Sequence, residues 1–553
     1  MRRMRGRAAL AVTIVCVSMI AAACSSSKKT TTTATTSGGT TPTVKDGGQI
    51  VYGLEQEPSG WNIGTSANND FSTEQIIRLI WPEAERPNPD FSVDPQPVLA
   101  ERPKLVSTSP FVVEWHINPQ ATWSDGVPVT SDDFQWYWEN CNGQLKTADC
   151  ASTSGYDQIA KAEMPDSKTW RATFKAPFVE YDGLFGVGAQ LPPAHIGRKI
   201  KDGWNHGFDA NPGGVSAGPY LFKEWVHGDH ITLTRNPNYW GPKPHLDTII
   251  FKIVAGTAGV DALRNNEVQM IYPQPTVDLV QKAQSLTNAT TQVNFGLQFE
   301  HIDFNFRNPL LAVPEVRKAI ALGIDRNAML TAILKPFSSK AARLDNRVYV
   351  STQKEYAAHG QEYAKQDIAA AQKALESAGF VKGADGIYAK GGKKLSFRFR
   401  FKSTVPHRPE VATFVQSQLK QVGIDIKIDG YTVGNGSILS SHDYDLILFA
   451  WVETPFPVSG NQQIYQTGQS SNFGAYSNKT VDDLMTKAAS ELDATKRADL
   501  MNQADVAMWN DLPSLPLWQL PTFIAFSNQY ANIQDNTTSE GPTWNAEQWG
   551  LKA

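Results

Sequence analysis

Apolar and polar positions predict β-structure in the first half of the chain. Residues 49–54 are expected to form the first strand of the fold, and 248–254 is a further apolar run. Residues 221–226 and 230–234 predict two strands that are separated by the turn-forming segment His227-Gly228-Asp229. Two strands joined by such a short turn are typical of a β-hairpin.

Apolar positions at helical spacing predict helices in the second half of the chain. Residues 367–380 and 411–422 each carry an apolar stripe, and a glycine stops both patterns. Isoleucines then alternate over 424–428, so a helix followed by a strand predicts a βαβ unit. Residues 481–509 are also expected to be helical, and a return strand should follow them.

The N-terminus is typical of an export signal. Several arginines precede an apolar stretch at 8–20 that is too short to span a membrane. Ala21-Ala22-Ala23-Cys24 resembles a bacterial lipobox, which predicts a signal peptide over 1–23 and a lipid on the Cys24 thiol. Secretion after cleavage without lipidation is the alternative. Residues 24–45 are rich in Ser and Thr and are expected to form the tether that follows the lipid.

Composition favours a globular exported protein. Of the 553 residues, 41% are hydrophobic and 10% aromatic, which excludes a disordered chain. The formal net charge of −4 becomes more negative when the arginines of the signal are removed, so no basic surface for nucleic acid is expected. Beyond the signal, no stretch reaches 18 apolar residues, so the lipid is the expected membrane contact.

Two cysteines remain after the signal and the lipidation site are set aside. Cys141 and Cys150 lie nine positions apart in a polar segment. In an oxidising compartment, such a pair is expected to form a disulfide. A metal site is the alternative, but two cysteines do not complete a ligand set, and no metal or other cofactor is expected.

Several ordered motifs resemble one protein family. Residues 215–240 read VSAGPYLFKEWVHGDHITLTRNPNYW, and 121–140 read ATWSDGVPVTSDDFQWYWEN. Residues 301–326 read HIDFNFRNPLLAVPEVRKAIALGIDR, and 418–428 read QLKQVGIDIKI. These blocks resemble the extracytoplasmic solute-binding proteins, family 5, of ABC importers for peptides, nickel and opines. The resemblance extends over most of the chain after Gly48.

The resemblance implies an α/β fold with two lobes, the periplasmic-binding-protein-like type II or "Venus flytrap" architecture, with an additional second-lobe subdomain. A solute bound between the lobes would favour the closed form by contacting both of them. The expected boundaries are 46–84, 209–298 and 516–553 for the first lobe, 85–208 for the added subdomain and 299–515 for the second lobe.

The candidate ligand site lies where the strand 444–451 ends. In peptide-binding members of the family, a Trp here packs over the ligand, and an Asp three residues later pairs with its α-ammonium group. This chain has Trp451, but Thr454 stands at the position of that Asp, and Leu448 stands where an Arg holds the ligand carboxylate. The resemblance implies this set of ligand-binding residues: Trp451, Glu453 in place of the missing Asp, Thr454, Tyr431 as a second aromatic, and Asn68 and Asn69 from a loop of the first lobe.

Two motifs that suggest catalysis have better structural explanations. Gly214-Val215-Ser216-Ala217-Gly218 matches the nucleophile elbow of hydrolases, but a strand rather than a helix is expected after it. Asp132 and Asp133 lie in the first turn of a predicted helix, where carboxylates favour the helix dipole. No catalytic residue is therefore expected.

The resemblance implies a receptor that is anchored by lipid to the outer face of the cytoplasmic membrane. It would bind a peptide or another small solute as a monomer and deliver it to an ABC permease and its ATPases. The alternative is an envelope protein of the same fold that binds a glycolipid, a lipid-linked sugar or a metal chelate in a regulatory or other non-import role.

Overall fold

The computed structural model describes most of the chain after the predicted signal peptide and tether. The residues described are 43–186, 188–254, 256–336, 338–432 and 435–553. Cys24 and the lipobox lie outside the described residues. Within the described part, none of the helices is long and apolar enough to span a membrane.

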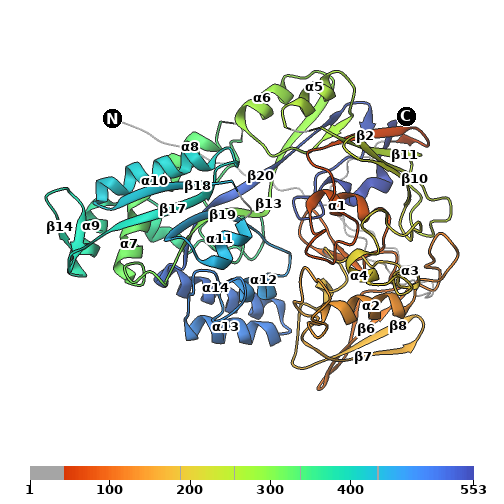
Figure 1. Cartoon of the computed structure of the whole chain (residues 1–553), viewed down its shortest axis with the longest axis horizontal. Coiled ribbons are helices and arrows are strands. Elements are labelled where there is room, and N and C mark those ends of the chain that lie inside the picture. Colours follow the sequence, from red (N-terminus) through yellow and green to blue (C-terminus); the bar gives the residue numbers. More distant parts are fainter. Residues whose placement is uncertain (1–42, 187, 255, 337, 433–434) are drawn as a thin grey trace, which may run out of the picture. The chain divides into compact units, whose positions relative to one another are not determined.

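A ten-stranded mixed sheet runs through both lobes (Figure 1). Its two longest strands, β13 and β20, pair antiparallel at the centre and connect the lobes. In spatial order the strands are β18 (Asp425–Tyr431), β17 (Ser396–Lys402), β19 (Leu446–Val452), β13 (Ala289–Phe304), β20 (Ser514–Ser527), β12 (Met270–Ile271), β2 (Gln49–Leu54), β11 (Thr248–Ile253), β10 (His230–Arg235) and β9 (Tyr220–Val226).

The ladder between β13 and β20 is interrupted near the centre of β13. Its register shifts between Phe295 and Phe299, and Gly296 lies between them. A Cβ at Gly296 would lie 2.1 Å from the carbonyl oxygen of Thr537, so only glycine permits this close approach. The lobe boundaries expected from the sequence at 298/299 and 515/516 fall inside β13 and β20.

The first lobe contains the predicted strands 49–54 and 248–254, which pair in parallel as β2 and β11. The predicted hairpin is also present, because β9 and β10 pair antiparallel across the turn at 227–229. Short strands and helices complete this lobe: β1 (Val44–Lys45), β21 (Tyr530–Ala531), β22 (Gly550–Lys552), α1 (Phe71–Ile77), α5 (Ala258–Arg264) and α6 (Val277–Gln284).

Residues 85–208 contain a four-stranded sheet and a two-stranded sheet and share a core with the first lobe. Trp115 and Trp170 of this segment belong to the same hydrophobic cluster as Ile50, Ile249 and Trp549. The large buried aromatic surfaces stabilise the junction of the two parts. The elements are β3 (Glu85–Pro87), β4 (Val93–Pro95), β5 (Lys104–Thr108), β6 (Phe111–His116), α2 (Ser131–Cys141), β7 (Ile159–Asp166), β8 (Thr169–Phe174), α3 (Ala194–Gly197) and α4 (Gly203–His206).

Two local features of this segment follow from the sequence. Thr130 caps α2 in a capping box with Asp133, whose carboxylate accepts from the Thr130 backbone N–H at 2.8 Å. Cys141 and Cys150 form a disulfide with a Cα–Cα distance of 5.4 Å. Closing so short a loop stabilises the fold by about 2–3 kcal/mol in the chain-entropy treatment.

The second lobe contains the predicted βαβ unit. Strands β17 and β18 pair in parallel, α10 (Arg408–Val422) connects them, and Gly423 ends this helix in the left-handed conformation. The remaining elements are α7 (Pro314–Gly323), α8 (Arg326–Ile333), α9 (Ile368–Ser377), β14 (Val381–Lys382), β15 (Tyr388–Lys390), β16 (Lys393–Lys394), α11 (Asn435–Ser441), α12 (Pro457–Tyr465), α13 (Lys479–Ser490) and α14 (Ala494–Asp511).

The helical segment predicted over 481–509 is divided in the structure. The chain leaves α13 at Glu491 and enters α14 after Asp493. The Asp493 carboxylate accepts from the backbone N–H groups of Thr495 and Lys496 at 2.9 and 3.0 Å. This side-chain cap starts a new helix, so α13 and α14 can pack against each other as an antiparallel pair.

Candidate ligand-binding site

Three cavities adjoin where the second lobe meets the other two parts of the chain. Their volumes are about 670, 430 and 330 Å³, and we call them the hinge, middle and loop cavities. The hinge and middle cavities share Asp90, Phe91 and Thr352, and the middle and loop cavities share Glu180 and Phe456. The three spaces therefore form a row with two narrow partitions.

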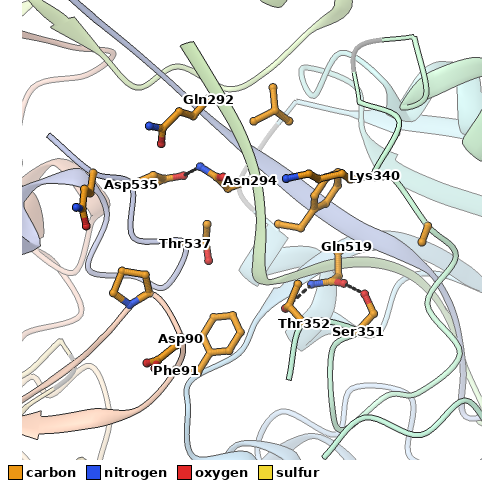
Figure 2. Close-up of a pocket in the computed structure, with 15 residues that line it drawn as sticks. Asp90, Phe91, Gln292, Asn294, Lys340, Ser351, Thr352, Gln519, Asp535 and Thr537 are labelled. Carbon is orange, nitrogen blue, oxygen red and sulfur yellow. Dashed lines mark hydrogen bonds between the residues drawn. The ribbon is translucent and has the colours of Figure 1, made fainter. Parts of the chain in front are cut away.

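Amide side chains from the connecting strands and hydroxyl side chains from other segments line much of the hinge cavity (Figure 2). Gln519 of β20 donates to the Gly296 carbonyl at 2.8 Å and to the Thr352 hydroxyl at 3.1 Å. Asn294 of β13 donates to the Asp535 carboxylate at 2.8 Å. These hydrogen bonds fix the side chains in place. The hinge cavity therefore has a preorganised polar wall that can form hydrogen bonds with a polar ligand.

The loop cavity brings two of the predicted site residues together. Asn69 follows the first strand of the first lobe, and Thr454 follows β19 of the second lobe. Glu74 and Glu180 also line this cavity, whereas no Lys, Arg or His is among its described lining residues. The lining favours a ligand group that donates hydrogen bonds or carries positive charge.

Glu453 lies directly behind the wall of the loop cavity. Its side chain is buried, and a Cβ added at the cavity-lining Gly460 would come within 3.0 Å of Glu453 Oε2. Among the described residues, Glu453 Oε1 has no hydrogen-bond partner. Burial and the nearby Glu180 carboxylate raise the pKa of Glu453 to about 8. Burying a carboxyl oxygen without a hydrogen-bond donor destabilises the folded protein. A ligand that supplies the donor would remove this free-energy cost.

Glu180 connects residues 85–208 to the second lobe. Its carboxylate oxygens accept from the backbone N–H groups of Val458 and Ser459 at 2.9 and 2.7 Å. Both N–H groups lie in the first turn of α12, and the N-terminus of a helix favours negative charge. Sequence reasoning missed Glu180, because nothing in its local pattern indicates a partner some 280 positions away.

The remaining predicted site residues are positioned by packing. Trp451 is half-buried and lies parallel to the rings of His301 and Phe473, at centroid distances of 6.0 and 6.1 Å. Tyr431 is only 6% exposed and packs in a cluster with Phe449. Neither aromatic residue is among those that line the hinge, middle or loop cavity.

The two asparagines of the first-lobe loop differ in their surroundings. Asn68 is buried, and its side-chain oxygen lies against Gly60, where a Cβ would come within 2.5 Å. Asn69 is exposed, and its amide donates to the Ile63 carbonyl at 3.1 Å. Only Asn69 of the two lines a cavity of the row, so Asn68 supports the loop.

Ser216 is in a structural setting. Its side chain is fully buried, and the hydroxyl donates to the Ile80 carbonyl at 2.8 Å. A strand, β9, follows this segment where a nucleophile elbow requires a helix. The match to the hydrolase pattern is thus explained by packing of the turn before β9.

Comparison with known sequences adds to this geometry. Residues 94–473 match the sequence profile of the bacterial extracellular solute-binding proteins, family 5 (middle region). The chain belongs to this family. The match covers more than half of the chain and includes in full all four motifs that suggested the resemblance, as well as part of the lining of the three cavities.

Family 5 relatives cover nearly the whole chain. The oligopeptide-binding protein OppA of Mycobacterium tuberculosis is 29% identical over 507 residues, which are 89% of this chain and 83% of the relative. The solved structure of the periplasmic EDTA-binding protein EppA is 26% identical, with a TM-score of 0.87, and the match covers 93% of this chain and 98% of that one.

A further solved structure shows the same fold. The oligopeptide-binding protein AppA from Bacillus subtilis, in complex with a nonapeptide, has a TM-score of 0.77 at 20% identity. The match covers 92% of this chain and all of the other. The two-lobed α/β architecture expected from the sequence is therefore confirmed.

Proposed function

We propose that this protein is the receptor of an ABC importer and captures an extended solute, a peptide, between its lobes. The observation that carries the proposal is the row of three cavities, because each is lined by residues from both sides of the junction. Because each cavity contacts both sides of this junction, a ligand bound in this row would favour the closed form. The closed form would then dock on the permease as a monomer.

The polarity of the row supports a peptide. Amides and hydroxyls of the hinge cavity match the alternating donors and acceptors of a peptide backbone. The relatives include proteins named for oligopeptide binding. The acidic lining of the loop cavity opposes a polyanionic chelate, although EppA is named for binding EDTA. A lipid-linked sugar with phosphate groups is disfavoured for the same reason.

Glu453 is proposed to take the place of the missing ammonium-binding Asp. It lies at the end of β19, its Oε1 has no partner among the residues described, and the cavity beside it lacks a cation. An ammonium group entering the loop cavity would favour the ionised form of Glu453 and satisfy it. Asn69 and Thr454, which line the same cavity, are proposed to contact the same end of the ligand.

Native mass spectrometry of the protein purified gently from its own host tests this function. We expect a ladder of added masses that disappears on denaturation and is identified as peptides of mixed sequence. A single non-peptide mass would contradict the peptide proposal and leave a solute receptor of another specificity. Genes for a permease and an ATPase beside the receptor gene would support the import role.

Attachment to the outer face of the cytoplasmic membrane is proposed through a lipid on Cys24. The lipobox-like sequence and the Ser/Thr-rich segment that follows it support the anchor. Changing Cys24→Ser is expected to move the protein from the membrane fraction to the soluble extracytoplasmic fraction. Equal membrane retention of the variant would exclude the lipid anchor. A Cys16→Ser variant, which changes the other cysteine of the signal region, is the matched control.

A further inference from the structure

Phe91 lies at the tip of the hairpin formed by β3 and β4, with an unusual backbone conformation. Its φ angle is 67°, in the left-handed region that residues with a side chain rarely adopt. Such outliers persist where the surrounding structure holds them, and they are frequent at ligand clamps. The contacts of the Phe91 ring show where this backbone conformation directs the side chain.

The tip of the hairpin is held by its own hydrogen bonds. The Asn88 backbone N–H donates to the Ser92 carbonyl at 2.7 Å, and the Phe91 N–H donates to the Asn88 carbonyl at 2.9 Å. The Ser92 N–H donates to the Asp90 carboxylate at 3.0 Å. None of these bonds uses the Phe91 side chain, so the ring can be changed without removing a bond of the turn.

The ring reaches from residues 85–208 to the second lobe. Phe91 packs against a buried apolar cluster from the second lobe and the middle of β13, and the half-buried Trp451 packs against the same cluster. The buried members of this cluster are Leu297, Phe299, Leu344 and Val350. In Figure 2, Phe91 lies below Thr537, with Thr352 to its right. The ring is therefore seated between parts of the chain that line the row of cavities.

Among the residues that the structure describes, Phe91 is one of three that line both the hinge cavity and the middle cavity. The other two, Asp90 and Thr352, have shorter side chains, and Asp90 is bonded to Ser92 of its own turn. We propose that the Phe91 ring is the wall between the two cavities and sets the length of ligand that the protein accepts. A chain bound in one cavity must end or turn at this ring.

This inference deepens the proposed function and depends on the ligand being bound in the row of cavities. Removal of the ring would join spaces of about 670 and 430 Å³ into one continuous channel. A longer chain could then pass from the amide-lined wall of the hinge cavity to the middle cavity. The limit on length would change, whereas the chemistry of recognition at Glu453 would not.

Phe91→Gly is the decisive variant, because glycine adopts a positive φ without strain and the turn keeps its bonds. Phe295→Ala is the matched control, because Phe295 lines the hinge cavity but is not among the residues that line the middle cavity. Thermal unfolding of each variant establishes that the fold is retained. Phe91→Tyr should keep the wall.

The affinities of a peptide ladder, from dipeptide to nonapeptide, are then measured by calorimetry after the resident ligand has been removed. Phe91→Gly is expected to bind peptides beyond the wild-type length limit at least about tenfold more tightly than the wild type does. Phe295→Ala and Phe91→Tyr should keep the wild-type limit. An unchanged length limit in a folded Phe91→Gly variant would overturn the inference.

Native mass spectrometry separates this inference from the proposed function. If the ligands that co-purify are not peptides, the peptide proposal fails, but the wall still predicts a higher upper mass limit in Phe91→Gly than in the wild type. If peptides co-purify with the same upper limit in both proteins, the peptide proposal holds and the wall is wrong.

Discussion

The ligand-free Glu453→Gln variant is expected to be more stable than the wild type at pH 9 and as stable as the wild type at pH 4. Burial and the Glu180 charge raise the pKa of Glu453 from 4.5 to about 8 in the folded state. At pH values between 4.5 and about 8, Glu453 is protonated in the folded state and ionised in the unfolded state, so unfolding releases a proton. The free energy of unfolding of the wild type therefore falls by up to about 1.4 kcal/mol per pH unit, and the loss is complete above the folded pKa.

Urea unfolding of both proteins from pH 4 to pH 9 measures this difference. Titrating groups that do not interact with Glu453 contribute equally to both proteins, so the difference between the two curves reports Glu453 together with its coupling to Glu180. Glu410→Gln, at an exposed position of α10, is the control for the loss of a surface carboxylate. Parallel curves for the wild type and Glu453→Gln would contradict a buried carboxyl group that is kept neutral near pH 7.

Glu180→Ala is expected to open the ligand-free protein and to weaken ligand binding by roughly 10- to 100-fold. The Glu180 carboxylate accepts two backbone hydrogen bonds from the N-terminus of α12 in the second lobe. Bonds to a charged acceptor each contribute about 1.5–3 kcal/mol. Their loss lowers the population of the closed form, and the apparent affinity falls with it.

Small-angle X-ray scattering of the ligand-free proteins tests the effect on closure, and calorimetry with the co-purified ligand tests affinity. Scattering is needed because Glu180 also lines the middle and loop cavities and can contact the ligand directly. Glu180→Gln keeps one acceptor oxygen and should lie between the wild type and Glu180→Ala. An unchanged radius of gyration in Glu180→Ala would show that this contact does not hold the lobes together.

Features set by neighbouring residues were predicted well from the sequence. The hairpin of β9 and β10, the start of α2 with Asp132 and Asp133 in its first turn and the glycine stop of α10 all depend on residues a few positions apart. The break between α13 and α14 was missed because the apolar pattern continues across it. The prediction followed the apolar periodicity and did not take into account that Asp493 can cap the start of a second helix.

The candidate site was predicted only in part. Asn69 and Thr454 do line one cavity, although they are far apart in the chain, because both follow strands of the same sheet. Tyr431 and Trp451 were predicted from their positions along the chain, by analogy with the family. Position in the sequence does not show which way an aromatic ring packs. In the structure, both rings lie in clusters of aromatic residues.

The sequence alone determined the regular elements, through periodicity and short motifs, and the fold family with its two-lobed α/β architecture, through the resemblance of its motifs to family 5. Only the tertiary structure decided how the lobes meet. The bonds of Glu180 to the N-terminus of α12, the packing of Phe91 on a cluster that includes the second lobe and the burial of Glu453 all depend on groups from distant parts of the chain. Burial and through-space contact create these properties, and neither is visible in the local order of residues.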